Sequence, residues 1–213
     1  MMTTKPPLPR TFTSPSKLET YLLPADVGFT RGTSTVSKLI RFFTRAKGEP
    51  PTYTNHTLGI GNGHNVVQAL AKVSEMPIEK WAAKVPEFEI WRKPNMEQLQ
   101  RFHIADTAEA HIGQVYGSLK IVAHLGDAFL TWVKGSGKSV RFFRRLCLMR
   151  DYPICSWLWG WAYSAHGERL SEIGPRYACP DDQHDYVSAS PEWVKVAAKY
   201  ANGDIAIYTL GEG

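Results

Sequence analysis

One stretch decides the fold, HTLGIGNGHNVVQAL (residues 56–70), which predicts two short strands joined by a turn. Aliphatic and β-branched residues are frequent in HTLGIG (56–61) and NVVQAL (65–70), and the turn-forming sequence Asn-Gly-His separates them. We therefore expect a hairpin, with His56 and Gln68 on adjacent strands. These two polar side chains are the first candidates for a functional site.

A second stretch, CSWLWGWAYSAH (residues 155–166), predicts a buried helix that begins at Cys155 and stops before Gly167. A cysteine at a helix start lies beside unpaired backbone N–H groups and the positive end of the helix dipole, which stabilise a thiolate. The same N–H groups can bind an oxyanion. Cys155 is thus a candidate nucleophile, although a cysteine at such a position is more often a small buried residue.

The other predicted elements surround these two. We expect strands over 27–30, 87–93 and 204–210, a helix after Pro94 that ends near Gly117, a turn or short helix opening at Pro180, and a helix over SPEWVKVAAKY (190–200). Strands and helices do not alternate regularly, so the predicted class is α+β.

The length of 213 residues predicts a single folded domain over residues 18–213. The first 17 residues contain four prolines and many Ser and Thr, a composition typical of a disordered N-terminal arm.

The composition narrows the function class. A net charge of +5 is too small to indicate a nucleic-acid partner, and it leaves a weak contact with an anionic surface open. The three cysteines, Cys147, Cys155 and Cys179, are expected to be free thiols. Neither a signal peptide nor a membrane span is recognisable, so we expect a cytoplasmic protein, with association with a phage or prophage as an alternative.

No cofactor or metal is predicted. Gly135 to Ser139 resembles the end of a phosphate-binding loop, but Trp132 stands where that motif requires glycine. The seven histidines and three cysteines form neither a Cys-x-x-Cys nor a His-Glu-x-x-His pattern.

A thiolate nucleophile needs a histidine within hydrogen-bond reach and a third polar group to orient the ring. His56 and Gln68 suit these tasks if they face the helix start at Cys155. His64 at the hairpin turn is the main alternative for the imidazole, and Asn65 is the alternative orienting residue. Cys147 and Cys179 have no comparable context and are expected to be structural.

A family resemblance extends over residues 24–196. PADVGFTRGTSTVSKLIRFFT and YTNHTLGIGNGHNVVQALAKVSEMPIEKW, followed by IGQVYG (112–117), YPICSWLWGWAY (152–163) and CPDD (179–182), are similar in order and spacing to the circularly permuted papain-like family of NlpC type, in its YiiX/YebB-like branch. The resemblance implies a permuted papain-like fold, an antiparallel sheet packed against helices, in which the His-bearing strands precede the nucleophile helix.

The resemblance also implies residue roles: Cys155 as nucleophile, His56 as base and Gln68 as orienting residue, with Tyr116 and Ser156 on the oxyanion or substrate side. Two positions depart from the family. The orienting position in this branch is often acidic, and Ile154 stands before the nucleophile where unpermuted relatives carry Asp.

The function expected from this resemblance is that of a cysteine hydrolase cleaving an amide bond of cell-wall-peptide type through a Cys155 thioester. Two alternatives stay open: a lipid or acyl-amide hydrolase or acyltransferase with the same site, and a catalytically silent binding or phage/host-interaction protein. In the lipid alternative the aromatic helix after Cys155 lines an apolar pocket, although such helices are more often core. The sequence leaves the oligomeric state open.

Overall fold

The computed structural model describes residues 10–33, 38, 53–115 and 155–208. They form an eight-stranded sheet in which every neighbouring pair is antiparallel, in the order β1-β8-β7-β6-β2-β3-β4-β5. The strands are β1 (Arg10–Thr13), β2 (Val27–Thr30), β3 (His56–Ile60), β4 (Asn65–Ala69), β5 (Val73–Pro77), β6 (Phe88–Arg92), β7 (Val194–Lys199) and β8 (Ile205–Tyr208). The predicted α+β class with an antiparallel sheet packed against helices is confirmed.

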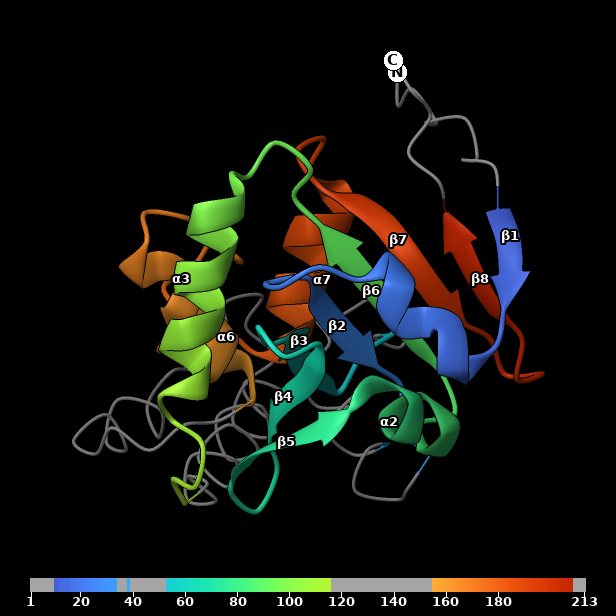
Figure 1. Cartoon of the computed structure of the whole chain (residues 1–213). Helices are drawn as coiled ribbons and strands as arrows, with labels where there is room; N and C mark the ends of the chain where they lie inside the picture. The colour runs from blue at the N-terminus through green and yellow to red at the C-terminus, as the bar shows by residue number, and fades with distance from the viewer. Residues whose placement is uncertain (1–9, 34–37, 39–52, 116–154, 209–213) are drawn as a thin grey trace, which may run out of the picture.

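One face of the sheet carries three helices: α3 (Gln98–Glu109), α6 (Cys155–Ala165) and α7 (Pro180–Ala189). Figure 1 shows α3 beside α6, and β1 with β8 at the opposite edge of the sheet. Buried side chains of the three helices pack on residues of β2 and β4, among them Phe29 and Val67. The predicted helix at Cys155 is confirmed, and it lies over β3 and β4.

The other face carries α2 (Ile78–Lys84) and a 3-10 helix, η1 (Pro15–Tyr21). Trp81 and Leu18 from these helices pack with Leu58, Ile60 and Val66 of the β3–β4 hairpin. The sheet is therefore covered by apolar side chains on both faces.

The predicted hairpin is confirmed and its register fixes which side chains share a face. Leu58 of β3 lies opposite Gln68 of β4. His56 is two residues before Leu58, so His56 and Gln68 lie on the same face as a diagonal pair. Leu58 belongs to the core beside α2, which places His56 and Gln68 on the α2 face.

Two sequence predictions are corrected. Residues 190–200 do not form a helix: Val194–Lys199 is β7, paired with both β6 and β8. The predicted unpacked arm over residues 1–17 is too long, because Arg10–Thr13 pairs with β8 and η1 begins at Pro15. In both segments, pairing and burial in the sheet outweigh local composition.

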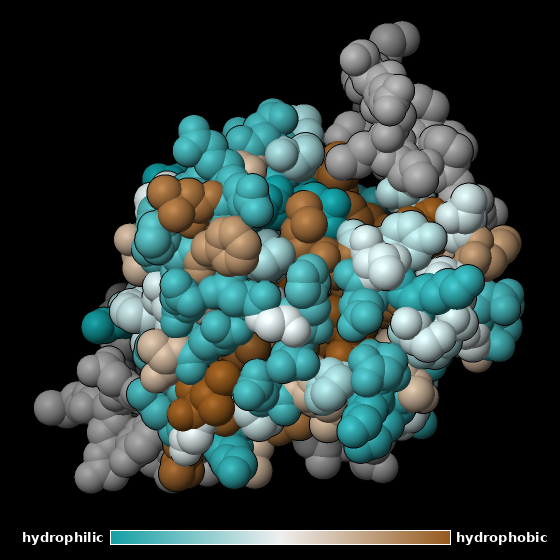
Figure 2. Space-filling view, viewed as in Figure 1, coloured by the Kyte–Doolittle hydropathy of each residue, from teal (hydrophilic) through white to brown (hydrophobic). Residues whose placement is uncertain are grey.

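Figure 2 shows the surface of the molecule in the same view as Figure 1, with hydrophobic residues in separate patches among hydrophilic ones. Scattered exposed apolar residues are ordinary for a folded domain. No helix in the described ranges has the length and apolar character needed to cross a membrane.

Candidate active site

Cys155 is the first residue of α6, as the sequence predicts, and its side chain is only 7% exposed. The helix position is fixed by Trp159, one turn further on, whose indole N–H donates to the carbonyl oxygen of Val67 at 3.0 Å. The nucleophile candidate is thus attached to the β3–β4 hairpin through its own helix.

His56, at the start of β3, lies between Gln68 and Cys155. Its Nε2 is 3.2 Å from Oε1 of Gln68, and its ring is also hydrogen-bonded to the Cys155 side chain. Because Nε2–H donates to the amide oxygen, Nδ1 is the nitrogen available to the sulfur. In the neutral ring Nδ1 is then an acceptor, which is the tautomer a base for the Cys155 thiol requires.

The electrostatics of His56 fit a thiolate–imidazolium pair. Burial alone would lower the pKa of His56, but the negative charge of Cys155, the hydrogen bond to Cys155 and the hydrogen bond to Gln68 together raise that pKa above its ordinary value of 6.5. The protonated ring is therefore favoured next to the sulfur.

The structure decides against the two alternatives within the hairpin. His64 is exposed in the turn with a φ of 55°, and it does not border the hollow that contains Cys155. The Asn65 side chain donates to Glu75 Oε2 at 3.0 Å. Of the four hairpin candidates, His56 and Gln68 are the two that the fold brings to Cys155.

Ser156 is predicted on the oxyanion or substrate side, and its hydroxyl lies in the core. Its side chain is fully buried and its hydroxyl donates to the carbonyl oxygen of Ala178 at 2.7 Å. The Ser156 hydroxyl is therefore engaged in the core, and an oxyanion role for this residue, through its backbone N–H, stays a prediction. Tyr116, the other residue predicted on that side, lies outside the described residues, as do Cys147 and the Gly135–Ser139 loop.

Cys179 is buried at the N-terminus of α7, where its backbone N–H donates to Asp182 Oδ2 at 2.7 Å. Burial, followed by the negative charge of Asp182, raises the pKa of the Cys179 thiol well above its usual value. A thiol in these surroundings stays protonated and is a poor nucleophile, which fits the predicted structural role.

A hollow of about 460 Å³ opens beside the Cys155–His56–Gln68 group. Most of its remaining lining is apolar and comes from the β4–β5 region and the α2 segment: Ala69, Leu70, Met76, Trp81 and Val85. The polar members are Thr30 of β2, Asn55 just before β3, and Lys84 of α2. From α6, Cys155 lines this hollow, whereas the aromatic residues of the helix do not. Trp159 and Tyr163 are fully buried core residues, so the apolar wall is supplied by the α2 face instead.

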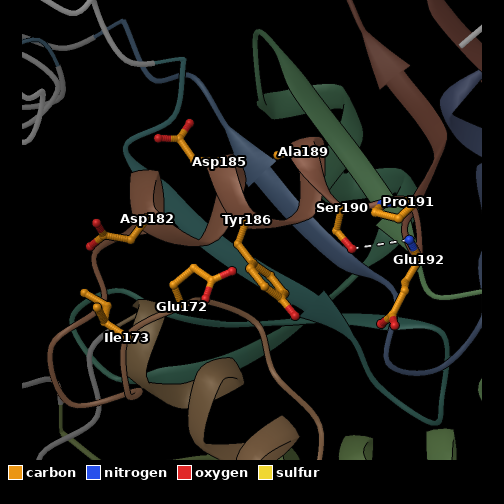
Figure 3. A pocket seen from close by; sticks show the side chains of 9 residues that line it. All are labelled: Glu172, Ile173, Asp182, Asp185, Tyr186, Ala189, Ser190, Pro191 and Glu192. Carbon is orange, nitrogen blue, oxygen red and sulfur yellow. Dashed lines mark hydrogen bonds between the residues drawn. The ribbon is translucent and has the colours of Figure 1, made fainter. Parts of the chain in front are cut away.

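A second hollow, of about 590 Å³, is bordered by α7 and the residues that precede and follow it (Figure 3). Four carboxylates border it, but Asp182 caps α7 and Glu192 pairs with Lys93 at 3.0 Å. Neither Cys155 nor His56 lines this hollow, so it is separate from the site at the helix start.

Sequence reasoning missed Gln183, a fully buried residue of α7. Its Oε1 accepts a hydrogen bond from the Thr57 hydroxyl at 2.8 Å, and its Nε2 donates to the carbonyl oxygen of Ser156 at 2.7 Å. No motif marks this glutamine.

Comparison with solved structures shows similarity at the level of the fold. The chain superposes on the crystal structure of the metalloprotein YiiX from Escherichia coli O157:H7 with a TM-score of 0.56 and 18% identity, covering 84% of this chain and 99% of that one. No family model and no curated protein matches the chain. The chain therefore has a YiiX-like fold.

YiiX is described as a metalloprotein, and the side chains around Cys155 in this chain provide few metal ligands. A protein metal site draws on three or more His, Cys, Asp or Glu side chains, whereas Cys155 and His56 are two. In the described part of the chain no group of three such residues is suitably placed. The donor set of the described residues therefore does not fit a metal ion.

Proposed function

We propose that the protein is a cysteine hydrolase of the permuted papain-like, NlpC-type family, acting on a carbonyl substrate through a thioester at Cys155. The observation that carries the proposal is the chain of contacts from Cys155 to His56 and from His56 to Gln68 at the start of a helix. This is the arrangement that thiol catalysis needs: nucleophile, base and orienting group in sequence.

In the proposed reaction, the Cys155 sulfur gives its proton to Nδ1 of His56 and attacks the carbonyl carbon of an amide. The negative charge that develops on the carbonyl oxygen lies near the backbone N–H groups of the first turn of α6, with Tyr116 as a further predicted donor. His56 then returns the proton to the leaving nitrogen, and the amine departs. Water, deprotonated by His56, cleaves the thioester to give a carboxylic acid and the free thiol.

The leading substrate class is an amide of cell-wall-peptide type. The lipid or acyl-amide alternative gains support from the hollow beside Cys155, because five of its lining residues are apolar and one is the cationic Lys84. An aliphatic chain would gain free energy by burial there, and Lys84 suits an anionic headgroup. A catalytically silent binding protein is the alternative that the first experiment below separates from both.

The test of the nucleophile is alkylation by iodoacetamide across pH, with peptide mapping to identify each cysteine. We expect Cys155 to react rapidly below pH 7, with the reaction slowed by His56→Ala and absent in Cys155→Ala. Cys179→Ala is the matched control and should leave the profile unchanged. An ordinary alkaline profile for Cys155 would contradict the hydrolase proposal and favour the silent protein.

The substrate test uses intact-protein mass spectrometry after incubation with muropeptides or with acyl-phospholipid vesicles. A mass increase on Cys155 with muropeptides supports the amidase, and an acyl adduct from the vesicles alone overturns the cell-wall assignment in favour of lipid. Because His56 deprotonates the water that hydrolyses the thioester, His56→Ala can be used to accumulate the adduct, at a lower rate of formation.

A further inference from the structure

We propose that Gln183 is a positioning residue that holds His56 and Cys155 together by joining β3 to the first turn of α6. The inference rests on the proposed function of the Cys155–His56 pair and adds a residue to it. The two partners of Gln183 are Thr57 and Ser156, which directly follow His56 and Cys155 in the chain.

The geometry of the contacts makes this a connection between two elements. Thr57 points to the face of the sheet that carries α6 and α7, whereas its neighbour His56 points to the α2 face. Gln183 is thus beneath the site on the opposite side of the strand and does not touch the reacting atoms. It accepts from a β3 side chain and donates to an α6 backbone carbonyl, so its single planar amide fixes the separation of the two elements.

The buried setting makes these hydrogen bonds hard to replace. Thr57, Ser156 and Gln183 are each 0% exposed, so water does not take over a lost partner. A second hydrogen bond joins the same two segments: the Ser156 hydroxyl donates to the carbonyl oxygen of Ala178, just before α7. Two hydrogen bonds therefore join the first turn of α6 to the α7 segment, and Gln183 also binds β3 through Thr57.

The packing around Gln183 leaves room for its amide and little more. A Cβ added to Gly160 of α6 would lie 2.9 Å from Gln183 Nε2 and 3.2 Å from Pro175 Cβ. Glycine at position 160 lets α7 approach α6 closely enough for the amide to reach Ser156. The close packing at Gly160 and the hydrogen bonds of Gln183 thus both fix the position of α6 relative to β3.

The test compares Gln183→Met, which keeps the approximate volume and removes both hydrogen bonds, with Val187→Ala as a control in the same helix. Val187 is fully buried but makes no contact in this connection, so its variant lowers stability without loosening the tie. Two quantities are measured at a temperature where all variants are folded: the titration of His56 by NMR and the rate of Cys155 alkylation at pH 6.

If Gln183 positions the pair, Gln183→Met lowers the pKa of His56, since contact with Cys155 is what raises it, and slows alkylation at pH 6 at least tenfold. Val187→Ala leaves both unchanged. Wild-type values for both quantities in Gln183→Met would overturn the proposal.

A second pair of variants covers the case in which Gln183→Met does not fold. Thr57→Ser keeps the hydroxyl and is expected to behave as wild type, whereas Thr57→Val removes it and is expected to reproduce the loss. Equal behaviour of the two would overturn the proposal. A different result would contradict the hydrolase proposal alone. In that case wild-type Cys155 shows an ordinary alkaline alkylation profile, while the titration of His56 still depends on Gln183 and Thr57.

Discussion

Gly59 of β3 lies directly against the indole ring of Trp159 in α6: a Cβ built on Gly59 would approach three ring atoms to between 2.5 and 2.6 Å. The absence of a side chain at this position is what lets the helix that begins with Cys155 settle on the strand that begins with His56. Close packing at one residue thus sets the distance between two elements of the site.

We expect Gly59→Ala to destabilise the fold by about 1–3 kcal/mol, because the methyl group overpacks the contact with Trp159. The same displacement of α6 should slow Cys155 alkylation at neutral pH. Chemical denaturation and alkylation kinetics measure the two effects. Gly63→Ala in the same hairpin is the control, since a Cβ there would meet Asn65 at an ordinary 3.6 Å. Similar stabilities for the two variants would contradict this account of the packing.

Gln68→Ala should reduce the rate of Cys155 acylation by about 10- to 100-fold, because the His56 ring loses the hydrogen bond that fixes its orientation and tautomer. Gln68→Glu should keep the orientation and raise the pKa of His56 further, through the added negative charge. Single-turnover acylation and the NMR titration of His56 give the two readouts. Asn65→Ala, which removes a side chain bound to Glu75, is the control that should leave both unchanged.

Cys155→Ala should lower the pKa of His56, because burial then acts with less opposition. In the wild type, the raised value means that the imidazolium persists above pH 6.5. The stabilisation that protonated His56 gives the fold is complete below the pKa of His56 in the unfolded chain. It is lost as pH rises through the pKa of His56 in the folded protein.

Hydrolysis should fall over the same alkaline range, since protonation of the leaving group needs the proton of His56. If Cys155→Ala leaves the pKa of His56 unchanged, Cys155 and His56 do not form the expected ion pair.

Arg92→Met should cost about 3–5 kcal/mol, because it leaves the fully buried Asp26 carboxylate without its closest cation. Arg92 Nη2 is 2.6 Å from Asp26 Oδ2, and Arg101 is a more distant partner at 3.5 Å. Arg31→Met is the comparison: Arg31 is exposed and lies 3.6 Å from Glu87, so its loss should cost at most about 1 kcal/mol. Equal unfolding free energies for the two variants would contradict the assigned burial effect.

The sequence was most informative where local pattern and tertiary environment agree. In the 56–70 hairpin and the helix at Cys155, the local sequence pattern and the burial in the fold favour the same structure. The ends predicted for both elements lie close to the observed ones. Segment 190–200 was mispredicted because VKVAAK is rich in helix-forming Ala and Lys, whereas its pairing with β6 and β8 is a long-range property.

The site was predictable to a similar extent. His56, Gln68 and Cys155 stand in recognisable local contexts, and the structure brings them together. The buried contact of the Ser156 hydroxyl was not predictable, because adjacency in sequence does not say which way the side chains of a first helical turn face. Gln183 was missed because its importance comes from two partners 126 and 27 residues away, which no local pattern encodes.

The register of the hairpin has a consequence for how this protein can vary. His56 and Gln68 share a face only while Leu58 stays opposite Gln68. A shift of one residue would carry Gln68 through the sheet to the side of α6. The turn at Asn62–His64, which is exposed at Gly63 and His64, determines that alignment, so insertions there should disturb the chemistry more than the fold. Homologues that keep the reaction are therefore expected to hold the length of this loop fixed and to vary Gly63 and His64 more than Asn62, whose side chain donates to Asp106 of α3.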